Sequence, residues 1–475
     1  MRQLLSLFKY YTGKSDPAVE TLPSSGSNRR YFRLKKDDIS LIGVHGESRK
    51  ENRAFIALSR HFHQQGLNTP EVLAVSEDEM FYIQQDLGDH ILFDAMKGGR
   101  LTGVFSHEEK ILLHKTIAML ADFQIKGAQR LDFDVCYPQP EFNSRSVYWD
   151  LNYFKYNFLK TTGMDFREDL LENDFEKLAE NLLKDQSETF MYRDFQSRNV
   201  MLVEGNPWFI DFQGGRKGPV YYDVASFLWQ AKANFPEELR NELIHTYIES
   251  LRKYQSVNEA DFVKQLRQFV LFRTLQVLGA YGFRGYFEKK PHFIQSIPFA
   301  LNNVRELFQD DFAEYPYLCK LLKEMTELKQ FADFQKRELQ VRVYSFAYKK
   351  GIPNDTSGNG GGYVFDCRAI NNPGKYERYN NVTGLDEPVI QFLEEDGEIL
   401  EFLDCIYPLV DRHVKRYEER GFTDLMVSFG CTGGQHRSVY AAQKTAEHIS
   451  KKFGVKVSLV HREQNLEQEF KKTAK

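Results

Sequence analysis

A polar stretch near the middle of the chain constrains the fold more than any other feature. Asp194 and Asn199 stand five positions apart, and Asp211 follows the apolar run 208–210. Hydrophobic residues around them predict short strands, so the three polar side chains belong to a loop–strand–turn–strand unit. An Asp-rich turn with Asn199 as a local cap is the structural alternative, but two carboxylates and one amide at this spacing favour a catalytic centre that uses a divalent cation.

The same spacing occurs in the catalytic loop of enzymes that transfer phosphoryl groups. Such a transfer needs a carboxylate that orients the attacking hydroxyl and accepts its proton, and oxygen ligands that hold Mg²⁺ on a triphosphate. The sequence therefore predicts Asp194 as the catalytic base, and Asn199 and Asp211 as the ligands of Mg²⁺. ATP and Mg²⁺ are the expected cofactors.

Two segments upstream are candidates for binding the nucleotide. A turn of small residues enters a strand, and such a turn can bring backbone N–H groups to phosphates; its candidate residues are Ser25, Gly26 and Ser27. A later strand runs into a glycine turn and suits the wall of an adenine pocket; its candidate residues are Gln85, Asp86 and Leu87. Each segment alone would pass for an ordinary turn.

Together these segments resemble the aminoglycoside phosphotransferase and choline kinase superfamily over roughly residues 20–335. The strongest similarity is to kinases of the anomeric hydroxyl of N-acetylmuramate and N-acetylglucosamine (AmgK type). The matching stretches are 29–33, 85–89, 193–199, 210–213 and 218–226. The resemblance implies an α+β bilobal protein-kinase-like fold for residues 1–335, with a β-rich N-lobe at about 1–90 and a helical C-lobe at about 91–335. It also gives Asp223 the role of supporting the catalytic loop.

The sequence departs from the general kinase pattern in one place. The strand 39–45, which would bear the lysine that binds phosphates, contains no lysine, and AmgK-type kinases are similar in this respect. Another cation must then hold the phosphates, and Arg30 and Arg33 are the candidates. The missing charge also leaves an inactive pseudokinase as an alternative, against which the complete set of catalytic residues argues.

The acceptor site is expected among helices of the C-lobe, as in the superfamily. Trp149 and Asp150 are the predicted substrate-binding residues, because an indole can stack on a sugar face and a carboxylate can accept hydroxyl groups. Packing of this aromatic helix face into a core is the alternative. Tyr281, Arg284 and Tyr286 are further candidates.

A second constellation lies near the C-terminus. A glycine-rich loop joins the predicted strand 425–430 to the predicted helix 439–452, and such a loop presents N–H groups and the positive end of a helix dipole to an anion. A tight strand–helix turn is the alternative. The loop also matches C-x-x-G-x-x-R-S of cysteine-dependent phosphatases, although Gly430 precedes the cysteine where these enzymes have histidine.

From residue 341 onward the chain resembles the C-terminal domain of RapZ, an RNase adaptor that senses glucosamine-6-phosphate. The matching stretches are 345–353, 363–368, 380–388, 430–439 and 460–463. The resemblance implies a smaller α/β domain at 340–475 that binds an amino-sugar phosphate. Its predicted ligands are Cys431, Thr432, Gly433, Gly434, His436, Arg437 and Ser438, with Asp355 and Asp366 as further polar candidates.

Two departures bear on RNA as a partner. The lysine that the family has before the loop histidine is Gln435 here, and the basic tail is short. The formal net charge of the whole chain is −4, whereas binding to an RNA backbone needs clustered cations. RNA therefore remains a possible partner that the charge disfavours.

The sequence thus predicts an ATP-dependent kinase of an amino-sugar hydroxyl, with the anomeric hydroxyl favoured, fused to a module for an amino-sugar phosphate. The alternatives are a kinase of an aminoglycoside or choline, and a non-catalytic pseudokinase adaptor that binds RNA or a protein. Five dispersed cysteines without a C-x-x-C pair, and the lack of a long apolar run, indicate a cytoplasmic protein without a membrane partner.

Overall fold

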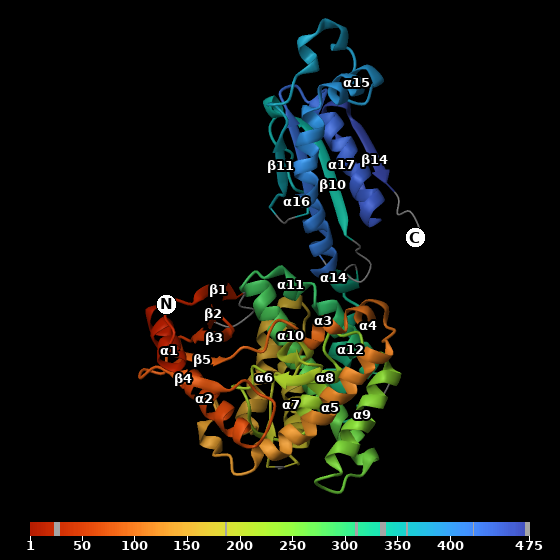
Figure 1. Cartoon of the computed structure of the whole chain (residues 1–475). Helices are drawn as coiled ribbons and strands as arrows, with labels where there is room; N and C mark the ends of the chain where they lie inside the picture. Colours follow the sequence, from red (N-terminus) through yellow and green to blue (C-terminus); the bar gives the residue numbers. More distant parts are fainter. Residues whose placement is uncertain are drawn as a thin grey trace. The chain divides into compact units, whose positions relative to one another are not determined.

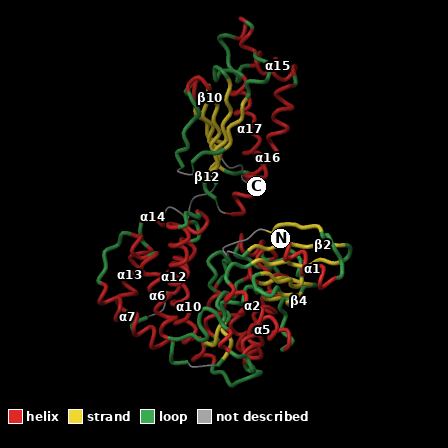
Figure 2. Tube along the Cα trace, turned by 90° about the vertical axis from the view of Figure 1, so that its left-hand side faces the viewer, coloured by secondary structure: helices red, strands yellow, loops and turns green. Residues whose placement is uncertain are grey.

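The computed structural model of the chain describes residues 1–22, 29–185, 188–308, 312–332, 339–357, 360–420 and 422–470 (Figures 1 and 2). The predicted phosphate-turn residues Ser25, Gly26 and Ser27 lie outside these ranges. Contacts between residues divide the chain into two compact units, Met1–Leu328 and Lys329–Lys475. Each unit is described by itself.

An antiparallel sheet of order β1-β2-β3-β5-β4 forms the start of the first unit. Its strands are β1 (Ala18–Leu22), β2 (Arg30–Lys36), β3 (Ile39–His45), β4 (Val72–Val75) and β5 (Phe81–Gln85). Side chains alternate between the two faces of a strand. Ile83 therefore packs with α1 (Arg2–Thr12) on one face, while its neighbour Tyr82 stacks on Phe55 of α2 (Arg49–Gln64) on the other.

Helices make up most of the rest of this unit. They are α3 (Leu92–Ala95), α4 (Lys97–Thr102), α5 (His107–Ala128), α6 (Ser144–Asn157), α7 (Glu168–Leu182), α8 (Tyr221–Leu228), α9 (Glu237–Leu251), α10 (Glu259–Gly282), α11 (Pro291–Ile294), α12 (Ile297–Leu307) and α13 (Pro316–Thr326). α10 is apolar around much of its circumference and packs against α6, α8 and α12, as expected of a central helix. Two small antiparallel pairs lie among the helices: β6 (Thr189–Met191) with β9 (Arg216–Gly218), and β7 (Val200–Val203) with β8 (Asn206–Phe209).

The second unit is built on a sheet of order β11-β12-β10-β13-β14. Its strands are β10 (Gln340–Ala347), β11 (Tyr363–Asp366), β12 (Asp424–Cys431), β13 (Lys456–His461) and β14 (Leu466–Phe470), of which only β14 runs antiparallel to its neighbour. Its longer helices are α15 (Glu387–Asp396), α16 (Glu398–Arg420) and α17 (Arg437–Phe453). α17 packs against β10, β12 and β13 and buries one apolar core.

The predicted fold class is confirmed: a β-rich N-terminal sheet precedes a helical region, and a smaller α/β domain follows. The helical part of the first unit ends with α13 at Thr326, and the short α14 (Lys329–Ala332) begins anew. The N–H of Leu328 bonds to the carbonyl of Met325, three residues back, and this tightened turn ends the helix.

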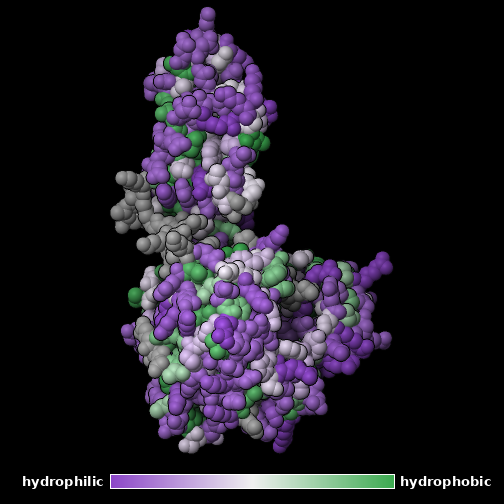
Figure 3. All heavy atoms as spheres, turned by 180° about the vertical axis from the view of Figure 1, so that it is seen from behind, coloured by the Kyte–Doolittle hydropathy of each residue, from purple (hydrophilic) through white to green (hydrophobic). Residues whose placement is uncertain are grey.

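Hydrophilic residues cover most of the face seen in Figure 3, with apolar residues in scattered groups. In the described part of the chain, no helix has the length and apolarity needed to cross a membrane.

Candidate active site

A buried carboxylate accepts hydrogen bonds from the loop that follows β6. Asp223, on α8, is fully buried, and its two oxygens accept the backbone N–H groups of Tyr192 and Arg193, both at 2.8 Å. The side-chain amide of Gln124, on α5, donates a third hydrogen bond at 2.8 Å. Burial raises the pKa of Asp223 to about 6, although these three donors favour the ionised form.

The three residues predicted at the catalytic centre lie together. The Asn199 side-chain amide donates to the backbone carbonyl of Asp194 at 2.8 Å and to Asp211 Oδ2 at 3.3 Å. The backbone closes the same unit, because the N–H of Ile210 donates to the carbonyl of Asn199 at 3.1 Å. The side chain of Asp194 is 55% exposed, so it faces outward from this unit.

The loop is strained at two non-glycine positions. Arg193 has φ +79° and Asp211 has φ +69°, both in the left-handed region. Such conformations cost about 1–3 kcal/mol each and persist where the surrounding structure fixes them. Here the Asp223 carboxylate fixes Arg193, and the hydrogen bonds from Asn199 and Gln213 fix the Asp211 side chain.

The donor set fits a magnesium ion. Burial and the negative charge of Asp194 both raise the pKa of Asp211, so the ionised pair is costly by itself. A divalent cation would offset that cost, and carboxylate and amide oxygens are the ligands that Mg²⁺ prefers. Within the described ranges, no group of three or more His, Cys, Asp or Glu side chains could hold a metal ion.

The two predicted substrate-binding residues, Asp150 and Trp149, lie in different environments. Asp150 is buried and forms a bidentate ion pair with Arg193, with Nη1–Oδ2 at 2.7 Å and Nη2–Oδ1 at 3.3 Å. Its carboxylate is therefore paired with Arg193 of the loop that follows β6. Trp149, the preceding residue on α6, is 51% exposed. Of the further candidates, Tyr281 lies close enough to Arg198 and Arg273 for their charges to act on its hydroxyl.

Arg273 is a residue of the site that the sequence analysis missed. It lies on α10, it is buried, and its Nη2 is 3.6 Å from Asp194 Oδ1, while its Nε donates to Ser226 Oγ at 3.2 Å. A signal was present, because Arg273 interrupts the apolar run 269–275, and a buried charge needs a partner.

Of the nucleotide candidates in the N-terminal sheet, Arg33 and Asp86 form an ion-pair network together with Asp89. Arg33 is buried, and its guanidinium lies 2.7 Å from Asp86 Oδ2 and 2.7 Å from Asp89 Oδ1. Arg30 lies on the opposite face of the sheet and contacts His45 Nδ1 at 3.3 Å. Gln85 ends β5 and Leu87 follows, both half-buried.

In the second unit, the glycine-rich loop runs from β12 into α17. Thr432 and Gly433 are exposed, whereas Gly434 has φ +65° and packs so closely on β10 that an added Cβ would lie 2.8 Å from the backbone nitrogen of Ala347. Gly434 is therefore required there by both conformation and space. Gln435 donates to the carbonyls of Asn380 and Val382 and so ties a neighbouring loop to this one.

The other predicted ligands of this loop turn into the protein. Arg437 Nη1 donates to the carbonyls of Arg368 and Ile370 at 2.9 and 2.6 Å. The buried His436 lies with Nε2 2.9 Å from the carbonyl of Tyr379. Cys431 and Ser438 are also buried and contact one another, Sγ to Oγ, at 3.1 Å. These side chains shape the loop, and Thr432 and Gly433 present its backbone to solvent.

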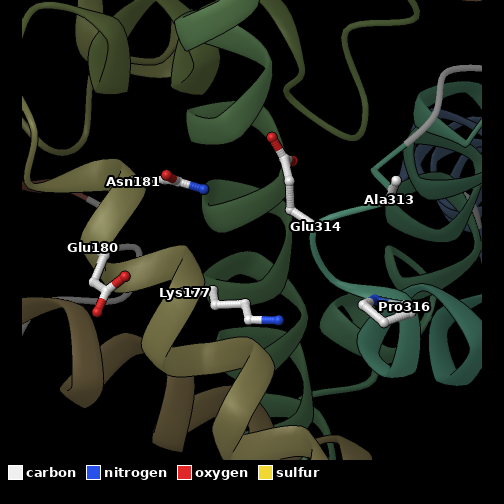
Figure 4. A pocket seen from close by; sticks show the side chains of 6 residues that line it. All are labelled: Lys177, Glu180, Asn181, Ala313, Glu314 and Pro316. Carbon is white, nitrogen blue, oxygen red and sulfur yellow. The ribbon is translucent and has the colours of Figure 1, made fainter.

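A surface pocket elsewhere contains none of the predicted site residues. It lies between α7 and the start of α13 and is lined by Lys177, Glu180, Asn181, Ala313, Glu314 and Pro316 (Figure 4). In Figure 4 the Lys177 side chain extends from α7 toward Pro316. The pocket is not part of the candidate site.

Curated relatives match part of the chain. A "Nucleotide-binding protein" of Petrotoga mobilis is 40% identical over 144 residues, which are 30% of this chain and 48% of that protein. A protein with the same description from Staphylococcus epidermidis is 33% identical over 174 residues, 35% of this chain and 56% of that protein. The chain thus spans about half the length of the curated relatives it matches.

Two solved structures resemble the first unit. Choline kinase from Cryptosporidium parvum Iowa II has 13% identity and a TM-score of 0.44, with 65% of this chain and 93% of that chain covered. The streptomycin–ATP–APH(2'')-IIa ternary complex has 13% identity and a TM-score of 0.44, covering 60% and 93%.

Family models cover both units. The RapZ C-terminal domain matches residues 339–465, and the phosphotransferase enzyme family (APH) matches residues 18–259, just over half of the chain. The catalytic loop and its supporting carboxylate lie within the second of these matches. The chain therefore belongs to the phosphotransferase enzyme family and carries a RapZ C-terminal domain after its kinase-like unit.

Proposed function

We propose that the chain is an ATP-dependent kinase of an amino-sugar hydroxyl, of the N-acetylglucosamine or N-acetylmuramate type and at the anomeric position. The observation that carries this proposal is the hydrogen-bonded unit of Asp194, Asn199 and Asp211 on a loop that Asp223 supports. Family membership supplies the reaction class. The C-terminal domain is proposed to bind an amino-sugar phosphate such as glucosamine-6-phosphate.

Each residue of this unit has a definite task in the proposed reaction. Asp194 accepts the proton of the acceptor hydroxyl and orients its oxygen for attack on phosphorus, and its exposed carboxylate is open to such a substrate. Asn199 and Asp211 would hold Mg²⁺, which would neutralise negative charge on the phosphates. Arg273 restrains the Asp194 carboxylate from the α10 side.

The substrate class rests on the agreement of two separate units. The first unit resembles amino-sugar kinases, and the domain that follows matches the RapZ C-terminal domain. The resemblance to RapZ implies an amino-sugar phosphate as the ligand of that domain. Trp149 supports the same class, because an exposed indole beside the buried Asp150–Arg193 pair offers a flat surface for a sugar ring.

A substrate screen with Mg·ATP tests the proposal. We expect transfer to N-acetylglucosamine or N-acetylmuramate, and ³¹P NMR of the product should show phosphate on the anomeric carbon. Kanamycin and choline serve as competing acceptors. Phosphate at C6 would refute the anomeric assignment, transfer only to kanamycin or choline would refute the substrate class, and no transfer to any acceptor would refute the kinase.

The C-terminal domain gives a separate prediction. Arg437→Ala should abolish glucosamine-6-phosphate binding in calorimetry, because the Arg437 guanidinium holds the carbonyls of Arg368 and Ile370 and thereby shapes the anion-binding loop. Arg412→Ala, an exposed change on α16, is the matched control. Unchanged affinity in Arg437→Ala would contradict the role of this loop.

A further inference from the structure

A buried glutamine stands two positions after the predicted metal ligand Asp211. Gln213 is only 8% exposed, and its Nε2 donates a hydrogen bond to Asp211 Oδ1 at 2.6 Å. Its Oε1 is also buried and has no hydrogen-bond partner among the residues that the structure describes. A buried acceptor without a partner lowers the stability of a fold. Stability therefore does not explain the amide at this position, whose hydrogen bond to Asp211 leads to the candidate active site.

The backbone around Gln213 is fixed on both sides. Before it, Phe212 is fully buried and stacks on Phe55 of α2, with ring centres 5.0 Å apart. After it, the N–H of Gly215 donates to the carbonyl of Phe212 at 2.9 Å and closes a tight turn that contains Gln213. Asp211 itself is held in the left-handed region, with φ +69°. Gln213 therefore acts on the Asp211 carboxylate from a rigid segment.

The two oxygens of the Asp211 carboxylate are held unequally. The hydrogen bond from Gln213 to Oδ1 is short, whereas Asn199 Nδ2 lies 3.3 Å from Oδ2, which is longer than the usual range. Asn199 Nδ2 also donates to the backbone carbonyl of Asp194 at 2.8 Å, so it keeps a partner when Oδ2 binds another group. Oδ2 is therefore the oxygen that can bind a cation at the smaller cost.

We propose that Gln213 is a positioning residue for the divalent cation: it holds Asp211 Oδ1 and so leaves Oδ2 for the metal. This proposal rests on the kinase function proposed above and deepens it, because it gives the two oxygens of one carboxylate different tasks. A neutral amide suits this task, since it orients the carboxylate without cancelling the negative charge that attracts a cation. Side chains that orient a metal ligand in this way commonly contribute about 10–100-fold to metal affinity.

Binding of Mn²⁺, which takes the same oxygen ligands as Mg²⁺, tests this role by electron paramagnetic resonance. Free Mn²⁺ is measured in the presence of the protein and AMP-PNP, and AMP-PNP alone serves as the blank. Gln213→Met keeps the length of the side chain but removes the amide, and it should raise the Kd for Mn²⁺ about tenfold or more. Gln255→Met, an exposed change in the loop before α10, is the matched control and should bind Mn²⁺ as the unchanged protein does.

A second variant and two further measurements separate positioning from a purely structural role. Gln213→Asn keeps an amide, but its side chain is one methylene too short to reach Oδ1, so it should lose Mn²⁺ affinity as Gln213→Met does. Both variants should have a Tm within about 3 °C of that of the unchanged protein. Saturating Mg²⁺ should restore their kcat to within about threefold, because the amide acts on the binding of the cation and not on the transfer itself.

The outcomes distinguish this role from the proposed function. An unchanged Kd for Mn²⁺ in either variant would overturn the positioning role of Gln213. A Tm that falls by more than about 10 °C together with the affinity would assign Gln213 to the fold and would overturn that role as well. If the unchanged protein binds no Mn²⁺ beyond the blank, both this role and the proposed kinase function are refuted.

Discussion

Asp194→Asn should lower kcat for sugar phosphorylation by about 10²–10⁴-fold, the usual contribution of a general base. The amide keeps the shape of the side chain but cannot accept the proton of the acceptor hydroxyl. Mg·AMP-PNP affinity should stay near that of the unchanged protein, because the proposed cation ligands are Asn199 and Asp211, not Asp194. Single-turnover kinetics and calorimetry measure the two quantities separately.

Asp165→Asn is the matched control, since Asp165 is exposed in a loop before α7. It should keep the full rate. An Asp194→Asn protein that retains more than about half of the rate would exclude general-base catalysis by this carboxylate. A variant that loses Mg·AMP-PNP binding in parallel would instead indicate that Asp194 helps to hold the cation.

The centre of the site was predictable because it is local in the chain. Asn199 hydrogen-bonds to Asp194 across five positions and to Asp211 across twelve, so one strand–turn–strand unit brings all three together. The spacing of the three residues along the chain is therefore enough to predict that they lie together. The resemblances to the kinase superfamily and to the RapZ C-terminal domain likewise implied the β-rich start, the helical middle and the α/β end of the chain.

The partners that the sequence did not reveal come from distant elements. Gln124 is 99 positions from Asp223, and Glu51 is 22 positions from Arg29 with two strands between them. For Asp150, too, the sequence did not reveal the partner, although it singled out the residue. Its residue type suits sugar hydroxyls, but only the packing of α6 beneath the catalytic loop reveals that Arg193 takes its carboxylate.

The glycine-rich loop has the residues of an anion-binding motif, but their side chains bond to the protein itself. Its glycines, arginine and histidine are typical of an anion site. The sheet topology places neighbouring backbone carbonyls within reach of Arg437 and His436, and both side chains bond to them. What the loop offers to a ligand is therefore its exposed backbone at Thr432 and Gly433, together with the start of α17.

Asp223 should give the first unit opposite pH dependences of activity and stability. Its folded pKa is about 6, raised by burial from an ordinary value of 3.8. The folded protein therefore binds more protons than the unfolded chain between these values, and the stability that Asp223 contributes falls as pH rises through this window. At about 1.4 kcal/mol per pKa unit the loss is on the order of 3 kcal/mol. Activity should rise over the same window, because the ionised carboxylate is the stronger acceptor for the N–H groups of Tyr192 and Arg193.

Asp223→Asn isolates the effect of this titration, because an amide does not titrate. The amide also presents an N–H group where the two backbone N–H groups of the loop need acceptors. All three tryptophans, Trp149, Trp208 and Trp229, lie in the first unit, so their fluorescence follows the unfolding of that unit alone. The difference in unfolding free energy between the unchanged protein and Asp223→Asn should shrink by about 3 kcal/mol from pH 4 to pH 8. A difference that is constant with pH, or that grows, would show that Asp223 folds with an ordinary or lowered pKa. The catalytic loop would then be supported by a carboxylate that is ionised throughout, and the acidic fall in activity would have to come from another group.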